Sequence, residues 1–151
     1  MVIHPPVVFA YYSLCLAVAS IALAGLIKGH EARRVHEAQL HWARAGFLIG
    51  TIGIGLGGLW AYTVLDWGGY WAWDPVETGS ILPWFALLMI VHARARTDSE
   101  RDSAILASPA LGMLAGALAI HATLVTRANG VWASVHSFVG NEEAENTTTR
   151  T

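Results

Sequence analysis

Four long apolar stretches separated by polar segments dominate the pattern along this chain of 151 residues. A helix of about 20 apolar residues is long enough to cross a bilayer. The pattern therefore predicts an all-α, polytopic membrane protein with four transmembrane helices, over Val7–Ile27, Ala45–Leu65, Pro75–Ala93 and Ala104–Thr126. We expect one transmembrane domain over residues 1–140, followed by a polar, disordered tail over residues 141–151.

Composition and charge narrow the class of protein. The chain is 54% hydrophobic and only 13% charged, which excludes an ordinary soluble domain. The net charge of -2 carries little information about partners; we expect membrane lipid as a partner and no nucleic acid. Cys15 is the single cysteine and there is no C-x-x-C-H motif, so the chain has no internal disulfide and is not itself a c-type cytochrome.

The distribution of basic residues predicts the orientation in the membrane. Because cytoplasmic loops carry an excess of Lys and Arg, the loops between the first and second and between the third and fourth helices should be cytoplasmic. Both termini and the loop between the second and third helices then lie on the outer face, an N-out/C-out arrangement. Seven of the nine basic residues fall in the two cytoplasmic loops: Lys28, Arg33, Arg34, Arg44, Arg94, Arg96 and Arg101.

The outer loop between the second and third helices is densely aromatic. Trp67, Tyr70, Trp71 and Trp73 lie within seven positions, which exceeds the isolated Trp or Tyr usual at a membrane interface. Flat aromatic faces at this density suit a flat, apolar and partly charged ligand, for which porphyrin is the obvious candidate. Asp74, Pro75 and Glu77 follow in the pattern of a helix N-cap with a capping box. The two carboxylates therefore either begin the helix only, or also border the ligand.

Two histidines far apart in the sequence join this loop on the outer face. His4 precedes Pro5 and Pro6 in a segment that we expect to be extended, because a residue before proline avoids the α region. His136 follows the fourth helix. Haem iron accepts an imidazole on each axial face, so His4 and His136 are predicted metal ligands, with the tryptophans covering the ring.

The remaining histidines each allow two interpretations. His92 is either a functional histidine inside the third span or an interfacial residue that reaches toward water. His121 in the fourth span either packs between helices or serves the cofactor. Three histidines between Lys28 and Arg44 could indicate a metal, but their spacing and the lack of cysteine favour a solvated loop, either irregular or helical; they are His30, His36 and His41.

Small residues recur along the second helix. Their spacing favours simple helix packing, and a tight seat for a cofactor is the alternative; they are Gly46, Gly50, Gly53 and Gly57.

The aromatic segment resembles the tryptophan-rich WWD motif of the haem-handling proteins of cytochrome c maturation. Within that superfamily the chain is most similar to the CcmF family, over residues 3–140. The matching elements outside the motif are His4-Pro5-Pro6, Trp60-Ala61-Tyr62, Leu82-Pro83-Trp84 and Val135-His136-Ser137-Phe138.

The resemblance implies an integral protein of a prokaryotic plasma membrane or an organellar inner membrane, acting as a subunit of cytochrome c haem lyase (holocytochrome c synthase). It implies that His4 and His136 ligate a transient substrate haem and that His92 ligates a separate b-type haem. Implied partners are apocytochrome c, a haem chaperone and other Ccm subunits. The residues that the motif would place around the haem ring are Trp67, Gly68, Tyr70, Trp71, Trp73, Asp74 and Glu77.

Some residues depart from the CcmF pattern. Tyr70 stands where CcmF has Trp, and Glu77-Thr78 is closer to the related CcsA (ResC) family. A CcmF is several times longer than this chain, which implies a short or split form that works with a second CcmF-like polypeptide. That polypeptide, or His121, would supply the partner of His92. Two other functions stay open: a haem transporter without lyase chemistry, and a structural subunit of a membrane complex without haem.

Overall fold

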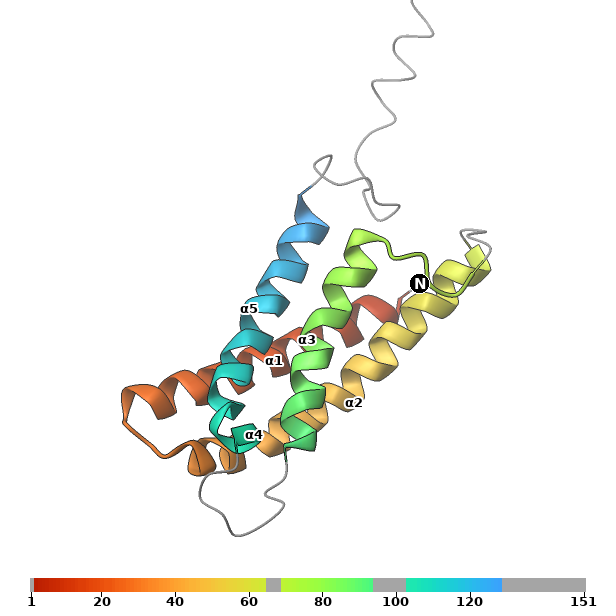
Figure 1. The fold of residues 1–151 in the computed structure, drawn as a ribbon. Helices are drawn as coiled ribbons and strands as arrows, with labels where there is room; N and C mark the ends of the chain where they lie inside the picture. The colour runs from red at the N-terminus through yellow and green to blue at the C-terminus, as the bar shows by residue number, and fades with distance from the viewer. Residues whose placement is uncertain (1, 65–68, 94–102, 129–151) are drawn as a thin grey trace, which may run out of the picture.

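The structure is a computed structural model that describes residues 2–64, 69–93 and 103–128. These ranges contain helices and no strand (Figure 1). The helices are α1 (His4–Ile27), α2 (Ala32–Val64), α3 (Pro75–His92), α4 (Ser103–Leu106) and α5 (Ser108–Arg127). Four of them, α1, α2, α3 and α5, are long and apolar enough to cross a membrane. The prediction of an all-α, polytopic membrane protein is confirmed.

The four long helices pack as a closed bundle. Helix α1 packs against α2 and α5, and α3 packs against the same two helices (Figure 1). The core between them is mostly small or aliphatic, with Tyr11 fully buried at its centre. Only 22% to 39% of each apolar span is buried inside the bundle. The outward faces remain apolar, as at Leu23, Met89 and Leu124, and such surfaces suit lipid rather than water.

A chain of buried hydrogen bonds ties α1, α2 and α5 together. Gln39 Nε2 donates to the Val18 carbonyl at 3.2 Å, and Ser108 Oγ donates to Gln39 Oε1 at 3.2 Å. His36 Nδ1 lies 2.8 Å from Ser108 Oγ, and since that hydroxyl already donates its hydrogen, His36 is the donor here. Gln39 and Ser108 are fully buried, so these mutual bonds satisfy groups that would otherwise be costly inside the bundle.

Helix α3 begins as the sequence predicts. The Asp74 side chain accepts a hydrogen bond from the Val76 backbone N–H at 2.9 Å. Glu77 Oε2 accepts from the Asp74 backbone N–H at 3.4 Å, which completes the capping box, and Pro75 occupies the first turn. The helix ends at His92, one residue before the predicted boundary.

The expectation of an extended His4-Pro5-Pro6 segment was wrong, because α1 begins at His4. Pro5 and Pro6 occupy the first turn, where the backbone N–H groups have no acceptor within the helix. The N–H group that each proline lacks would therefore make no helical hydrogen bond there. Packing against α2 also holds His4 in place, since its ring lies against Gly53 and Gly57.

The loop expected between Lys28 and Arg44 is largely helical. Helix α2 begins at Ala32 and runs 33 residues, about 50 Å, which is longer than the hydrocarbon core of a bilayer. Val35, His36, Gln39 and Ala43 form its buried face. His36 is therefore buried rather than solvated. In the described ranges, the histidines of this segment form no group that could hold a metal ion.

The predicted fourth span is divided by a turn at Ala107 into α4 and α5. Pro109 lies in the first turn of α5, the position in a helix where its missing N–H is tolerated. Residues 141–151, the expected tail, lie outside the described ranges.

Candidate functional site

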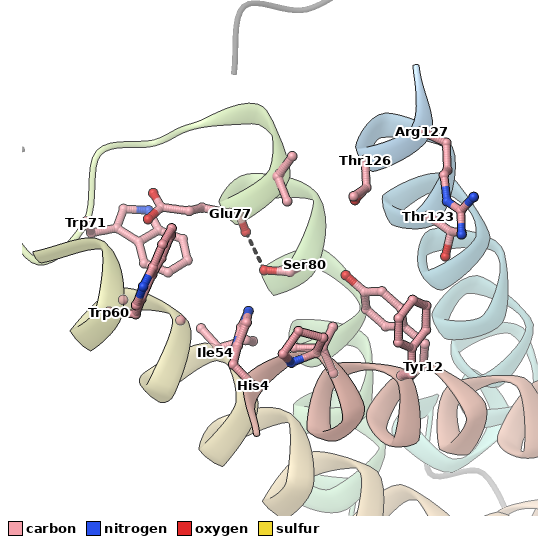
Figure 2. A pocket seen from close by; sticks show the side chains of 16 residues that line it. His4, Tyr12, Ile54, Trp60, Trp71, Glu77, Ser80, Thr123, Thr126 and Arg127 are labelled. Carbon is pink, nitrogen blue, oxygen red and sulfur yellow. Dashed lines mark hydrogen bonds between the residues drawn. The ribbon is translucent and has the colours of Figure 1, made fainter. Parts of the chain in front are cut away.

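A cavity of about 660 Å³ lies at one end of the bundle, where α1 and α3 begin and α2 and α5 end (Figure 2). Its size falls in the range of about 300–1,000 Å³ that is typical of small-molecule sites. The four long helices and Trp71 all contribute to its lining. The cavity therefore joins segments from the beginning, the middle and the later part of the described sequence.

His4 lies at the floor of this cavity (Figure 2). Its Nδ1 is 3.0 Å from the Gly53 carbonyl oxygen. A carbonyl can only accept, so Nδ1 carries a hydrogen, and in the neutral form of the ring the lone pair is then on Nε2. A Cβ at Gly57 would come within 2.7 Å of the ring carbon Cε1, so only glycine leaves room for the ring there. A hydrogen bond from one ring nitrogen to a backbone carbonyl is the usual way in which a metal-binding histidine is oriented.

Trp60, Trp71 and Glu77 lie on one side of the cavity (Figure 2). Glu77 Oε2 accepts hydrogen bonds from the Ala72 and Asp74 backbone N–H groups at 3.0 and 3.4 Å. Glu77 Oε1 and Trp71 Nε1 are buried and have no hydrogen-bond partner among the described residues. A buried polar atom left unpaired costs about 1–3 kcal/mol. Their position indicates that a polar group of a ligand, or water, would meet them inside the cavity.

Tyr12, Thr123 and Arg127 lie on the opposite side (Figure 2). The Thr123 hydroxyl donates to the Ala119 carbonyl at 2.9 Å. Ser80, between the two sides, donates its hydroxyl hydrogen to the Glu77 carbonyl at 2.7 Å. The cavity thus combines an imidazole nitrogen, two indole rings, a carboxylate and a guanidinium around an apolar volume, and this set suits a flat apolar ligand with a metal centre and acidic groups.

Three of the predicted site residues, His4, Trp71 and Glu77, line the cavity. The Tyr70 ring lies instead against Gly58 of α2, and its hydroxyl donates to the Gly55 carbonyl.

Trp73 and Asp74 do not line the cavity. Trp73 is 73% exposed and has a left-handed backbone conformation with φ 57°. Its ring and that of Trp71 form a T-shaped pair with the centroids 6.1 Å apart. Asp74 is buried at the start of α3 as the N-cap. Trp67, Gly68 and His136 lie outside the described residues.

His92 is the last residue of α3 and is therefore at the other end of the bundle from the cavity. It is exposed on the surface of the bundle, and its Nδ1 donates to the Leu88 carbonyl at 2.9 Å. His121 lies six residues before the end of α5, toward the end that carries the cavity. The structure therefore places His121 and His92 toward opposite ends of the bundle.

Sequence reasoning missed several lining residues, including Tyr12, Trp60, Ser80 and Arg127. Trp60 entered only as part of the family resemblance. Helical spacing is the signal that could have found Tyr12 and Ser80, because Tyr12 follows His4 by eight positions and Ser80 follows Glu77 by three. Arg127 needed knowledge of which helices are neighbours.

Comparison with known proteins identifies relatives of the chain. Residues 1–135 match the family described as cytochrome C assembly protein. The probable cytochrome c-type biogenesis protein NrfE of Escherichia coli is 36% identical over 138 residues, 91% of this chain and 25% of that protein. The cytochrome c-type biogenesis protein ccl1 of Rhodobacter capsulatus is 36% identical over 144 residues, 93% of this chain and 21% of that protein. The Haemophilus influenzae protein CcmF is 34% identical over 145 residues, 93% of this chain and 22% of that protein.

The chain thus spans about a quarter or less of the length of these relatives. No solved structure matches it. Because the family match covers most of the sequence, the chain belongs to the cytochrome c assembly protein family.

Proposed function

We propose that the cavity binds haem at the outer face of the membrane and that the chain presents this haem for covalent attachment to apocytochrome c, as part of a haem lyase complex. The observation that carries the proposal is the orientation of His4. The Gly53 carbonyl fixes the Nδ1–H tautomer, and Nε2, the nitrogen that can ligate iron, belongs to a ring on the cavity floor. His136 would be the second axial ligand.

The cavity fits a porphyrin in size and in chemistry. Its volume is large enough for a small-molecule cofactor, and the indole rings of Trp60 and Trp71 line it, as suits a flat aromatic ligand. The polar atoms left unpaired at Trp71 and Glu77 also point to a ligand.

The chain would assist attachment by holding and orienting its ligand. Bound haem supplies the vinyl groups to which the two thiols of an apocytochrome C-x-x-C-H segment add. Cys15 is fully buried in the bundle core and is not a nucleophile for this reaction. What remains for the chain is to fix the ligand, exclude water from an apolar cavity and bring the reactants together.

The relatives' names point to the kind of partners, because each is called a cytochrome c-type biogenesis protein. We propose that this chain works with apocytochrome c, a haem chaperone and other Ccm subunits. We also propose a b-type haem at His92. This histidine is exposed on the outside of the bundle, and its second ligand would come from a second CcmF-like polypeptide.

Haem content of the purified chain tests the proposal. We expect the wild-type protein to show a Soret band, and His4→Ala and His136→Ala to lose most of it because each removes an axial ligand. His41→Ala is the matched control, since His41 is exposed on α2 and does not line the cavity. A wild-type protein without haem, or a His4→Ala protein with unchanged haem, would contradict the proposal.

A second assay separates attachment from transport. Purified chain, reduced haem and apocytochrome are mixed, and covalent haem is detected on a denaturing gel. A lyase component increases the covalent product in a manner that depends on His4. A carrier transfers haem without forming that product, and a structural subunit does neither.

A further inference from the structure

The two sides of the cavity are lined by different kinds of side chain. The indoles and the buried carboxylate of Glu77 lie on one side, and Tyr12 and Arg127 lie on the opposite side (Figure 2). Arg127 is the single Lys or Arg among the described residues that line the cavity. A ligand with an acidic edge would therefore bind with that edge toward Arg127 and away from Glu77.

The Tyr12 hydroxyl belongs to a nearly buried side chain. Tyr12 is 9% exposed and lies two turns after His4 on the same face of α1. Its neighbour Tyr11 donates its hydroxyl to the Ser80 carbonyl at 3.1 Å, whereas the Tyr12 hydroxyl makes no hydrogen bond within the described ranges. Figure 2 shows this hydroxyl pointing into the cavity. This hydroxyl is therefore available to donate to an acceptor on a ligand in the cavity.

Arg127 supplies the positive charge on the same side. It lies in the last turn of α5, and Figure 2 shows its side chain running back along the helix toward Thr123. The hydroxyls of Thr123 and Thr126 donate to backbone carbonyls of α5, each at 2.9 Å, and so are left only as acceptors. Among the described residues no carboxylate pairs with Arg127. Its guanidinium is therefore the group on this side that can bind an anion.

We propose that Arg127 and Tyr12 form a carboxylate-binding edge of the cavity, which holds the acidic groups of the bound ligand. The proposal rests on the proposed function, in which these groups are the two propionates of haem. A guanidinium binds a carboxylate through two parallel N–H donors, and a phenol adds a third donor. Contact at this edge would fix the rotation of the ring about the bond from His4 to iron, so Arg127 and Tyr12 are positioning residues.

The test compares haem with its dimethyl ester, which has the same ring and iron but no carboxylate. Both are titrated into the purified full chain in detergent and followed by the Soret band. We expect Arg127→Gln to weaken haem binding about tenfold, as befits the loss of a charged hydrogen bond, and to leave ester binding unchanged. Arg127→Lys should restore part of the loss. Tyr12→Phe should weaken haem binding by a smaller factor and again spare the ester.

Matched controls remove the same groups elsewhere. Arg34→Gln removes an exposed arginine of α2 that is not part of the cavity, and Tyr62→Phe removes an exposed tyrosine hydroxyl on the same helix. Neither should change the affinity for haem or for the ester. Ester binding by Arg127→Gln at the wild-type level also shows that the variant is folded.

Three outcomes are distinguishable. If Arg127→Gln weakens haem and ester equally, or weakens neither, the carboxylate-binding edge is wrong even though the cavity binds haem. If the wild-type chain binds neither ligand, the proposed function fails and the edge fails with it. Loss of affinity for haem but not for the ester in Arg127→Gln, with partial rescue by Arg127→Lys, supports both the proposed function and the carboxylate-binding edge.

Discussion

Three side chains near the start of α3 perform different tasks. Trp71 and Glu77 line the cavity, and both keep a buried polar atom that no described residue pairs. Asp74 lies between them in sequence but caps α3 through the Val76 N–H. The aromatic segment and the residues after it therefore partly line the cavity and partly cap the helix.

The role of Asp74 can be separated from ligand binding by substitution. We expect Asp74→Ala to lower the free energy of unfolding by about 1 kcal/mol, and Asp74→Ser to keep most of the stability, because serine also caps helices well. Thermal unfolding in detergent, followed by circular dichroism, measures both. If Asp74 only caps, Asp74→Ser binds haem like the wild type. An equal loss of haem in both variants would show that the carboxylate itself touches the ligand.

Helix α2 carries a line of glycines whose tasks change along its length. A Cβ at Gly46 would come within 2.9 Å of Leu87 of α3, and one at Gly50 within 2.8 Å of Tyr11 of α1. A Cβ at Gly53 would make tight contacts of 3.3 Å with Val7 and Val8 of α1. One turn further, Gly57 faces the ring of His4. Helix packing, the interpretation favoured by the sequence, therefore explains Gly46, Gly50 and Gly53. Gly57 instead makes room for the side chain of His4.

Substitution at Gly50 tests this packing. A Cβ there would lie 2.8 Å from the ring of Tyr11, which is fully buried and cannot move aside. We expect Gly50→Ala to destabilise the protein by about 1–3 kcal/mol, the usual cost of overpacking. Gly55→Ala is the control, since its nearest neighbour would be the Tyr70 hydroxyl at 3.8 Å, and it should be neutral or stabilising by up to about 1 kcal/mol. Equal melting temperatures for the two variants would contradict the packing account.

The hydrophobic pattern predicted the helices far better than their ends. It located all four spans, and Asp74 and Glu77 predicted where α3 begins. It left the helical state of residues 32–44 open and wrongly predicted that they are solvated, because their polar side chains resemble a loop until Gln39 and His36 find partners on other helices. Hydrogen bonds between distant segments carry no local signal, so the burial of this part of α2 could not be predicted from its own residues.

The candidate site was predictable only where single residues are chemically distinctive. His4, Trp71 and Glu77 were chosen from the sequence and meet at one cavity. Tyr12 and Arg127 look ordinary in the sequence and gain meaning only because α1 packs against α5. The three-dimensional arrangement of the helices thus adds one side of the cavity to what the motif defines.

Orientation in the membrane stays a prediction from the distribution of basic residues, and labelling can test it. In a Cys15→Ala background, a single cysteine is placed at Ile3, which is 71% exposed near the cavity end, or at Glu31, which is exposed before α2. A membrane-impermeant maleimide should label Ile3→Cys in intact spheroplasts and Glu31→Cys only after lysis. The reverse result would place the cavity on the cytoplasmic side and exclude attachment at the outer face.

The central claim is that the imidazole of His4 binds the iron of a haem held in the cavity. His4→Gly removes this ring and leaves space for free imidazole beside Gly57. The decisive measurement is the absorption spectrum of haem-loaded His4→Gly, recorded before and after imidazole is added. We expect the wild-type Soret band to be lost or shifted in the variant and restored by imidazole. A variant spectrum identical to that of the wild type, with no response to imidazole, would contradict the claim.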